Sequence, residues 1–389
     1  MKKVLILGGG FAGVEAAIFL KKKKNLEVTL VSDRDYFYIY PTSIWIPTGV
    51  TSKENISVPL DQIAIKHGFK LIVDPVATLE AKSKKATLAS GRVLKDFDYL
   101  VVALGQGKIQ AKGLENTLSI CGKPEEAVAL KEKLDELMEK GSGKIAMGFG
   151  GNPKDTSAVR GGPAFEVLFN VHNMLKKKGL RDKFELTFFA PMDKPGQKMG
   201  DKALVMMDKM FKMTNISKKV GTKITSFEPD GIVFEDGEKI ESDLTMFISA
   251  GKGHPILEAS DLPLSDAGFV VTNKFNEVAD FEGVYAIGDS ASLMGPEWRA
   301  KQGHVAEVMA RNVANNIDVN INGGKRESYM EHLNILCVMD TGDGAAFVYR
   351  SDTTAQMIPL PIIGHWMKLG WGWYCKNSKL GKMFRLPGM

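Results

Sequence analysis

The chain has 389 residues, of which 44% are hydrophobic and 25% are charged, and its formal net charge is +5. These values are typical of a soluble globular protein with two or three cores, and no run of 18 apolar residues is present to cross a bilayer. The three cysteines, Cys121, Cys337 and Cys375, lie far apart without a C-x-x-C motif, which argues against a disulfide scaffold and against a metal site.

The chain begins with a short apolar run, Val4–Leu7, that predicts a buried parallel strand. The run ends at the motif Gly8-x-Gly10-x-x-Gly13, and residues 14–20 then predict a helix. In such a motif Gly8 allows the tight turn, Gly10 lets the backbone approach a diphosphate, and Gly13 lets the helix pack on the strand. A diphosphate would lie at the helix N-terminus, where free N–H groups favour anions. We expect a dinucleotide-binding unit here rather than a glycine-rich turn without a ligand.

The second predicted strand, residues 27–31, ends at Ser32-Asp33, about 20 residues after the turn, where an acidic side chain commonly holds a ribose. An aromatic-rich connection follows, Tyr36–Pro41 with Trp45, which either covers a planar ring or packs in the core. The first apolar run is too short for an export signal, so we expect the protein on the cytoplasmic side.

Two more strands are expected to complete this first unit. Residues 70–73 predict a strand that ends near Val76-Ala77. Residues 97–105 predict a buried strand that ends in the small-residue turn Ala103-Leu104-Gly105.

A second unit repeats the order of strands and helices of the first, with weaker binding motifs. Residues 125–141 predict a helix with a solvated, charged face. A strand–turn–helix follows over residues 144–175, but its turn is stretched through residues 153–156. After the next strand, residues 184–189, the first acid is Asp193, which lies beyond a proline. We therefore expect a Rossmann-like unit with poor features for binding NAD(P)H.

Two later segments are expected to fold together with the first unit. After a buried strand over residues 244–251, residues 284–289 predict a strand that ends in Gly288-Asp289. A helix over residues 303–317 follows, and Lys301-Gln302-Gly303 precedes its first turn.

The tail from Ile358 to Met389 has no acidic residue, six basic or histidine residues and three of the five tryptophans. Basic residues mixed with tryptophan favour a segment that lies in a membrane interface, with its lysines at anionic headgroups. The alternatives are an amphipathic helix docked on the protein itself and a nucleic-acid patch. We expect no nucleic acid, because the rest of the chain supplies no basic groove.

The glycine turn, Ser32-Asp33, Ala103-Leu104-Gly105 and Gly288-Asp289 together resemble flavoproteins with two dinucleotide-binding domains, related to glutathione reductase. The resemblance narrows to sulfide:quinone oxidoreductases and flavocytochrome c sulfide dehydrogenases at residues 31–37, 119–121, 162–166, Cys337-x-x-Asp340 and His365-Trp366-x-Lys368. It implies an α/β fold with two Rossmann-like domains and a C-terminal amphipathic region that associates with membranes. The implied boundaries are 1–110 with 270–330 for the FAD domain, 111–269 for the second domain and 331–389 for the C-terminal region.

The resemblance implies FAD as the cofactor, with the backbone of Lys301-Gln302-Gly303 at the pyrimidine edge of the flavin, where reduction places negative charge. The alternative for that segment is an ordinary helix start. The implied FAD-binding residues are Gly8, Gly10, Phe11, Ala12, Gly13, Ser32, Asp33, Arg34, Pro41, Ala77, Ala103, Leu104, Gly105, Gly288, Asp289, Lys301, Gln302 and Gly303.

The resemblance also implies a redox reaction in which sulfide attacks a disulfide and a thiolate passes two electrons to FAD. Cys337 matches one redox cysteine of these families, with a buried structural thiol as the alternative. The partner cysteine is replaced by Arg160, and two histidines usual near the sulfide channel are missing. Arg160 therefore either lowers the pKa of Cys337, binds an anionic sulfur substrate or is a surface or loop arginine.

Three further assignments follow from the resemblance. Glu166 moves protons near the flavin or is a helix-start charge. Cys121 attaches FAD or holds sulfur, or is a loop thiol. The residues that align with positions around the quinone ring are Leu336, Phe347, Lys368 and Trp371, each of which has core or interfacial packing as its alternative.

The sequence thus predicts an FAD-dependent, peripheral membrane oxidoreductase that passes electrons from a small sulfur-containing donor to a membrane quinone. Its rivals are a type II NADH:quinone oxidoreductase, a flavin-bound sensor or partner without turnover, and a flavin subunit paired with a cytochrome. A homo-oligomer is also open.

Overall fold

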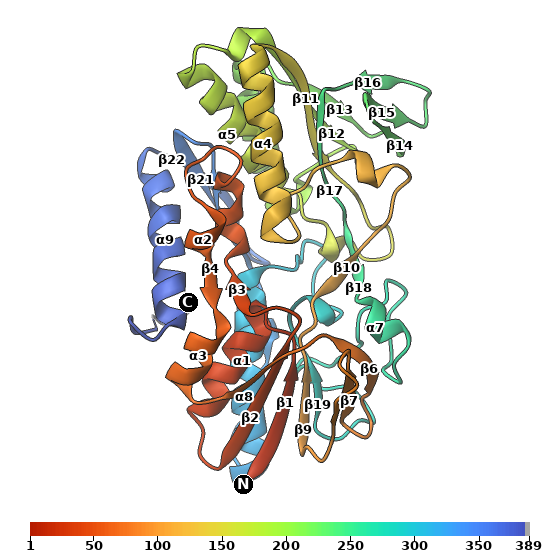
Figure 1. The fold of residues 1–389 in the computed structure, drawn as a ribbon, viewed down its shortest axis with the longest axis vertical. Coiled ribbons are helices and arrows are strands. Elements are labelled where there is room, and N and C mark those ends of the chain that lie inside the picture. The colour runs from red at the N-terminus through yellow and green to blue at the C-terminus, as the bar shows by residue number, and fades with distance from the viewer. Residues whose placement is uncertain (386–389) are drawn as a thin grey trace.

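The computed structural model describes residues 1–385, which form two parallel sheets with a C-terminal region along one side (Figure 1). This α/β architecture confirms the predicted fold class. The boundaries expected at residues 110, 269 and 330 stay a prediction. None of the helices within residues 1–385 has the length and apolar character needed to span a bilayer.

The first sheet has five parallel strands in the order β19-β9-β1-β2-β5. These are β1 (Lys2–Leu7), β2 (Leu26–Ser32), β5 (Lys70–Val73), β9 (Tyr99–Val102) and β19 (Val284–Ala286). The apolar runs predicted all five strands because both faces of the sheet are covered: Val4–Leu7 of β1 and Leu100–Val102 of β9 are all buried. The helices α1 (Phe11–Lys21) and α8 (Gly303–Asn322) pack against each other on this sheet (Figure 1).

Smaller elements surround the first sheet. They are β3 (Tyr36–Tyr38), α2 (Lys53–Ile56), β4 (Ser57–Pro59), α3 (Leu60–His67), β6 (Val76–Glu80), β7 (Lys85–Leu88), β8 (Val93–Leu94) and α7 (Pro255–Glu258). One expectation is wrong here: the strand over residues 70–73 does not run on to Val76-Ala77. It ends at Val73, and Val76 begins the separate strand β6, which pairs with β7.

The second sheet has four parallel strands in the order β13-β12-β11-β17. These are β11 (Gly143–Phe149), β12 (Phe184–Ala190), β13 (Ser217–Val220) and β17 (Leu244–Ile248), with the helices α4 (Pro124–Lys140), α5 (Gly162–Lys177) and α6 (Asp201–Thr214). A three-stranded sheet of β14 (Ile224–Glu228), β15 (Gly231–Phe234) and β16 (Lys239–Glu241) packs on it through a phenylalanine cluster. The chain passes between the two parallel sheets through an antiparallel pair, β10 (Gln106–Lys108) and β18 (Gly251–Gly253).

The C-terminal region is an antiparallel meander of β20 (Ile335–Asp340), β21 (Gly344–Arg350) and β22 (Ala355–Pro361), followed by α9 (Ile363–Lys379). Figure 1 shows α9 beside the N-terminal segment that contains α2 and α3. Hydrogen bonds join these segments: Lys376 donates to the carbonyl of Asn55, and the ring of His67 bonds to the carbonyl of Lys379 at 2.8 Å.

Three cations of the tail lie in ion pairs inside the protein. Lys368 pairs with Glu166, and Lys379 and Arg385 both pair with Glu15, which is fully buried on α1. The expectation that the tail lysines meet lipid headgroups is therefore wrong for Lys368 and Lys379, because each has a buried carboxylate partner.

The opposite face of the tail carries large apolar side chains that are exposed. Trp366 is 66% and Trp373 is 59% exposed. We call this set the C-terminal apolar surface; it comprises Ile358, Ile362, Ile363, Trp366, Met367, Trp373 and Phe384. One face of α9 thus docks on the protein while the other faces outward.

Candidate functional site

A single large cavity, of about 2120 Å³, runs from the glycine turn of the first sheet to α9. Among the residues expected to bind FAD, it is lined by Gly8, Gly10, Phe11, Ala12, Asp33, Arg34, Pro41, Ala103, Leu104, Gly105, Gly288, Asp289, Lys301, Gln302 and Gly303. All the residues expected around the donor and the quinone line it too: Cys121, Arg160, Glu166, Leu336, Cys337, Phe347, Lys368 and Trp371. The fold therefore brings residues more than 300 positions apart into one continuous space.

Three expected FAD-binding residues do not line this cavity. Gly13 packs the helix on the strand, because a Cβ there would lie 1.8 Å from the carbonyl oxygen of Gly8. Ser32 is buried beneath the turn, where its hydroxyl donates to the carbonyl of Arg34 at 2.6 Å. Ala77 is exposed on β6; side chains alternate along a strand, and its neighbours Pro75 and Val76 line the cavity instead.

The glycine turn fits the diphosphate of FAD. Gly8 has a φ of +118°, and a Cβ there would lie 2.1 Å from the carbonyl oxygen of Ala103. A Cβ at Gly10 would meet nothing within 4 Å, so its backbone faces open space. Gly10 also caps α1 without any side-chain hydrogen bond, which leaves the first N–H groups of the helix available to an anion. Close by, the Nε atom of Arg34 is buried without a partner and is available to a polar ligand.

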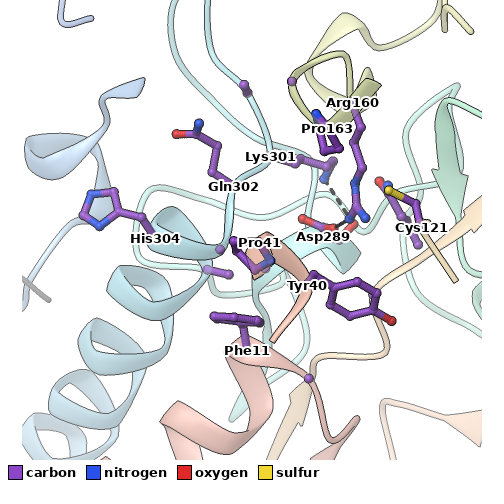
Figure 2. A pocket seen from close by; sticks show the side chains of 18 of the residues that line it. Phe11, Tyr40, Pro41, Cys121, Arg160, Pro163, Asp289, Lys301, Gln302 and His304 are labelled. Carbon is purple, nitrogen blue, oxygen red and sulfur yellow. Dashed lines mark hydrogen bonds and ion pairs between the residues drawn. The ribbon is translucent and has the colours of Figure 1, made fainter. Parts of the chain in front are cut away.

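The aromatic connection is divided between the core and the cavity wall. Phe37, Tyr38 and Trp45 are buried in the core, whereas Tyr40 and Pro41 line the cavity. Figure 2 shows Pro41 and Tyr40 above Phe11, on the side of the cavity formed by the first sheet.

Arg160 reaches across the cavity to Asp289, with which it forms an ion pair (Figure 2). The same guanidinium acts on Cys121: burial raises the pKa of that thiol, and Arg160 opposes the rise. Lys301 lies beside them with its amine donating to the carbonyls of Asp289 and Ala291, and burial lowers its pKa to about 8. Arg160 is therefore a cavity residue and not a surface arginine.

The thiol of Cys337 lies in a different setting. Burial raises its pKa to about 12, Glu166 adds to the rise, and Lys368 opposes it. The charges that act on this thiol thus come from α5 and α9. The idea that Arg160 lowers the pKa of Cys337 finds no support, because that guanidinium is engaged with Asp289 and Cys121.

Glu166 and Lys368 form a buried ion pair at the α9 end of the cavity. Their side chains are 5% and 6% exposed. Glu166 also accepts a hydrogen bond from the backbone N–H of Asp340 at 2.7 Å, and burial raises its pKa although Lys368 opposes the rise. Such a pair can hold or release a proton without exposing the site to water.

Sequence reasoning missed Lys198, whose amine donates to the carbonyls of Thr156 at 2.6 Å and Arg299 at 2.8 Å. Burial lowers its pKa to about 8. No motif pointed to it, because its acceptors are backbone groups of two distant loops. It also missed the links of Asp340 to His365 and Trp45, although both Asp340 and His365 stand in motifs quoted for the resemblance.

Two amides of the turn after β11 are occupied by a side chain, unlike those of the first turn. The side-chain oxygen of Asn152 accepts from the N–H groups of Lys154 at 2.9 Å and Asp155 at 3.2 Å, and its amide donates to the carbonyl of Gly251. Strand β12 ends at Ala190 without an acid to hold a ribose. Both features agree with the weak NAD(P)H motifs of the sequence.

Comparisons with known proteins give a consistent picture. The model of the pyridine nucleotide-disulphide oxidoreductase family matches residues 2–311. A sulfide-quinone reductase of Aquifex aeolicus is 28% identical over 371 residues, which cover 90% of this chain and 83% of the relative. A type II NADH:quinone oxidoreductase of Staphylococcus epidermidis is 25% identical over 382 residues, 91% of this chain and 92% of the relative. The solved structure of the Aquifex aeolicus sulfide:quinone oxidoreductase superposes with a TM-score of 0.87 at 25% identity, covering 98% of this chain and 92% of that one.

Proposed function

Since the chain belongs to the pyridine nucleotide-disulphide oxidoreductase family, we propose that it oxidises a reduced sulfur compound and passes the electrons to a membrane quinone. It is a flavin oxidoreductase that acts on quinone, and FAD is its cofactor. What we propose beyond this is the electron donor, a reduced sulfur compound. The observation that carries it is the single cavity that holds the glycine turn, Cys337 and the Glu166–Lys368 pair together.

Bound FAD supplies a two-electron acceptor within this cavity. The N–H groups at the start of α1 would hold the diphosphate, Asp289 would orient the ribityl chain, and the backbone after Lys301 would face the edge of the flavin where reduction places negative charge. Cys337 would bond the donor sulfur: with hydrosulfide as the donor, an S–S bond forms between the two sulfurs, the thiol loses its proton, and the two electrons released go to FAD. Because its thiol is protonated at neutral pH, Glu166 is the group assigned to take up its proton.

The donor has to bring the second sulfur, because Arg160 stands in place of a partner cysteine and the three cysteines, all within residues 1–385, are free. Two amines, that of half-buried Lys198 and that of buried Lys301, line the same space and donate to backbone carbonyls. Together with Arg160 they favour an anionic donor, such as hydrosulfide or a polysulfide.

The similarity to type II NADH:quinone oxidoreductases makes NADH the rival donor. The Asn152 side chain argues against it, because it occupies the amides of Lys154 and Asp155 in the turn after β11. Fewer amides of that turn are then free to meet a second diphosphate.

Anaerobic addition of sulfide, polysulfide and NADH in turn to the purified flavoprotein, with the flavin absorbance recorded, separates these donors. Sulfide or polysulfide is expected to bleach the flavin, and a soluble quinone is expected to restore its colour. Bleaching by NADH alone would replace this proposal by the rival. A protein that keeps its FAD but responds to no donor would be a sensor or partner, and co-purified haem would indicate a cytochrome partner.

We also propose that the C-terminal apolar surface contacts the membrane from which the quinone comes. Replacing both Trp366 and Trp373 by serine is expected to reduce sedimentation with anionic liposomes by about tenfold or more, because two interfacial aromatic contacts are lost. Val93→Ser, at an exposed apolar residue on β8, is the matched control and leaves binding unchanged. Equal binding of all three proteins would reject this surface as the contact.

A further inference from the structure

After α9 the chain turns back along the helix. Gly381 has a left-handed φ of +64°, and the N–H of Lys382 donates to a carbonyl in the last turn of α9 at 2.9 Å. Helices commonly end in this way, with a glycine where a positive φ is required. The carbonyl of Phe384 then accepts from the hydroxyl of Tyr374 at 3.3 Å, ten residues earlier in the chain. We call residues 381–385 the C-terminal strap.

The C-terminal strap ends at the cavity. Helix α9 lines the cavity with side chains three or four residues apart, at Lys368, Trp371, Cys375 and Ser378, over a length of about 15 Å. Arg385 lines the cavity as well, and its guanidinium donates to the hydroxyl of Ser378 at 2.8 Å. The strap therefore bounds the cavity at the end of the row of α9 side chains.

Arg385 is held there by a cluster of buried charges. It pairs with Glu15 on α1 and lies 3.8 Å from Glu307 on α8. Arg311 also pairs with Glu15, at 2.8 Å, and Lys379 pairs with both carboxylates.

The charges of this cluster balance without Arg385. Among residues 1–385, three cations share the two carboxylates of Glu15 and Glu307 through these ion pairs. If Arg385 leaves, Arg311 and Lys379 still compensate both carboxylates, so no buried charge loses its counterion. The Nε atom of Arg385 is moreover buried without a hydrogen-bond partner among the described residues. Arg385 is thus the member of the cluster that can be released.

The neighbouring residue of the strap faces the other way. Phe384 is 72% exposed and belongs to the C-terminal apolar surface, whereas the side chain of Arg385 is 14% exposed. A bilayer interface stabilises an inserted phenyl ring, and the phosphates of anionic lipids attract a guanidinium. A membrane at this surface therefore acts on both side chains in the same direction, away from the cavity.

Resting on the proposed membrane contact of the C-terminal apolar surface, we propose that the C-terminal strap closes the α9 end of the cavity in solution and opens it at an anionic membrane. Phe384 enters the interface, and Arg385 exchanges Glu15 for a lipid phosphate. Lys379 and Arg311 remain with Glu15, so the rest of α9 keeps its place. Protein that is detached from the membrane keeps this end of its cavity shut.

The thiol of Cys375 reports on the strap, because it lines the cavity beside Arg385 and is 4% exposed. The holoenzyme is treated with N-ethylmaleimide, and modification of Cys375 is followed by peptide mass spectrometry. Vesicles of phosphatidylglycerol are expected to raise the rate about tenfold, because the reagent reacts with the open state, which is sparsely populated in solution. Inorganic phosphate at the same concentration is expected to leave the rate unchanged, since it offers Phe384 no apolar phase.

Two substitutions in the strap separate its two contacts. Arg385→Gln is expected to raise the rate about tenfold without vesicles. Burial raises the pKa of the Cys375 thiol to about 12, and Lys379 and Arg385 oppose the rise, so loss of the Arg385 charge alone would slow the reaction. Phe384→Ser keeps the ion pairs and is expected to lose the acceleration by vesicles. Lys382→Gln, at an exposed cation of the same strap, is the matched control and is expected to react like the unsubstituted protein.

These measurements need neither a donor nor a quinone, so they stand apart from the proposed reaction. An unchanged or slower rate in Arg385→Gln would overturn this inference, as would an unchanged rate in protein that sediments with the vesicles. Acceleration by inorganic phosphate alone, or by vesicles in Phe384→Ser, would overturn the role of the bilayer. Failure of the unsubstituted protein to sediment with vesicles would instead overturn the proposed membrane contact, and with it the release of the strap.

Discussion

Replacing Cys337 by serine is expected to lower the rate of donor-dependent flavin reduction by more than about 100-fold, because a hydroxyl cannot bond the donor sulfur. The measurement is anaerobic stopped-flow absorbance of the flavin after mixing with sulfide or polysulfide. Reoxidation of chemically reduced protein by quinone is expected to stay normal, since the Glu166–Lys368 pair is intact in this variant.

The chain offers a matched control for this substitution. Cys375 is buried and Cys337 half-buried, and desolvation raises the pKa of each thiol to about 12. Cys375 is part of α9, two turns after Lys368, and the charges that act on it are those of Lys379, Glu307 and Arg385 rather than those of Glu166 and Lys368. Cys375→Ser is expected to keep donor-dependent reduction, and unchanged reduction in Cys337→Ser would remove Cys337 from the mechanism.

Replacing Lys368 by methionine is expected to cost about 3–5 kcal/mol of stability at about pH 8 and little at about pH 5. The variant leaves Glu166 buried without its cation, so the pKa of this carboxyl, already raised by burial, rises further. A carboxyl whose pKa is raised in the folded state stabilises that state below the pKa of the unfolded chain, and this contribution is lost as the pH increases. Urea unfolding midpoints at the two pH values measure the difference.

Two further variants separate charge from packing. Lys368→Met with Glu166→Gln removes both charges and is expected to recover most of the stability at high pH. Lys376→Met removes an α9 lysine that bonds only to the carbonyl of Asn55 and is expected to show no pH-dependent loss. An equal loss for Lys368→Met at both pH values would mean that packing, and not the uncompensated carboxylate, causes it.

The first unit could be predicted closely because its signals are local. The apolar run of β1 and the spacing of the three glycines are signals that lie within a few residues of one another. In the structure a Cβ at Gly8 or Gly13 would clash with neighbouring backbone atoms, and Gly10 faces the open cavity. The turn after β11 could also be recognised as unlike the first one, since its extra residues are visible in the sequence.

The C-terminal region was harder because its determinants are long-range. The sequence predicted that the tail lysines contact lipid headgroups. In the structure Lys368 and Lys379 form ion pairs with carboxylates on α5 and α1, and no local sequence pattern connects these partners. The same holds for Asp340, whose partners His365 and Trp45 come from both ends of the chain. Sequence motifs indicated which of these residues matter, but only the fold pairs them.

Residues from the second half of the chain complete the structure of the first half. Strand β19 joins the sheet of β1, and Lys379 and Arg385 form ion pairs with Glu15 on α1. During translation, the four strands of the second sheet all lie within residues 143–248 and can assemble while the ribosome is still working. The sheet of β1 lacks its edge strand until β19, at residues 284–286, has been synthesised. The sheet synthesised first is therefore completed after the second one, and the cavity gains Gly288, Asp289 and Lys301 only at that stage.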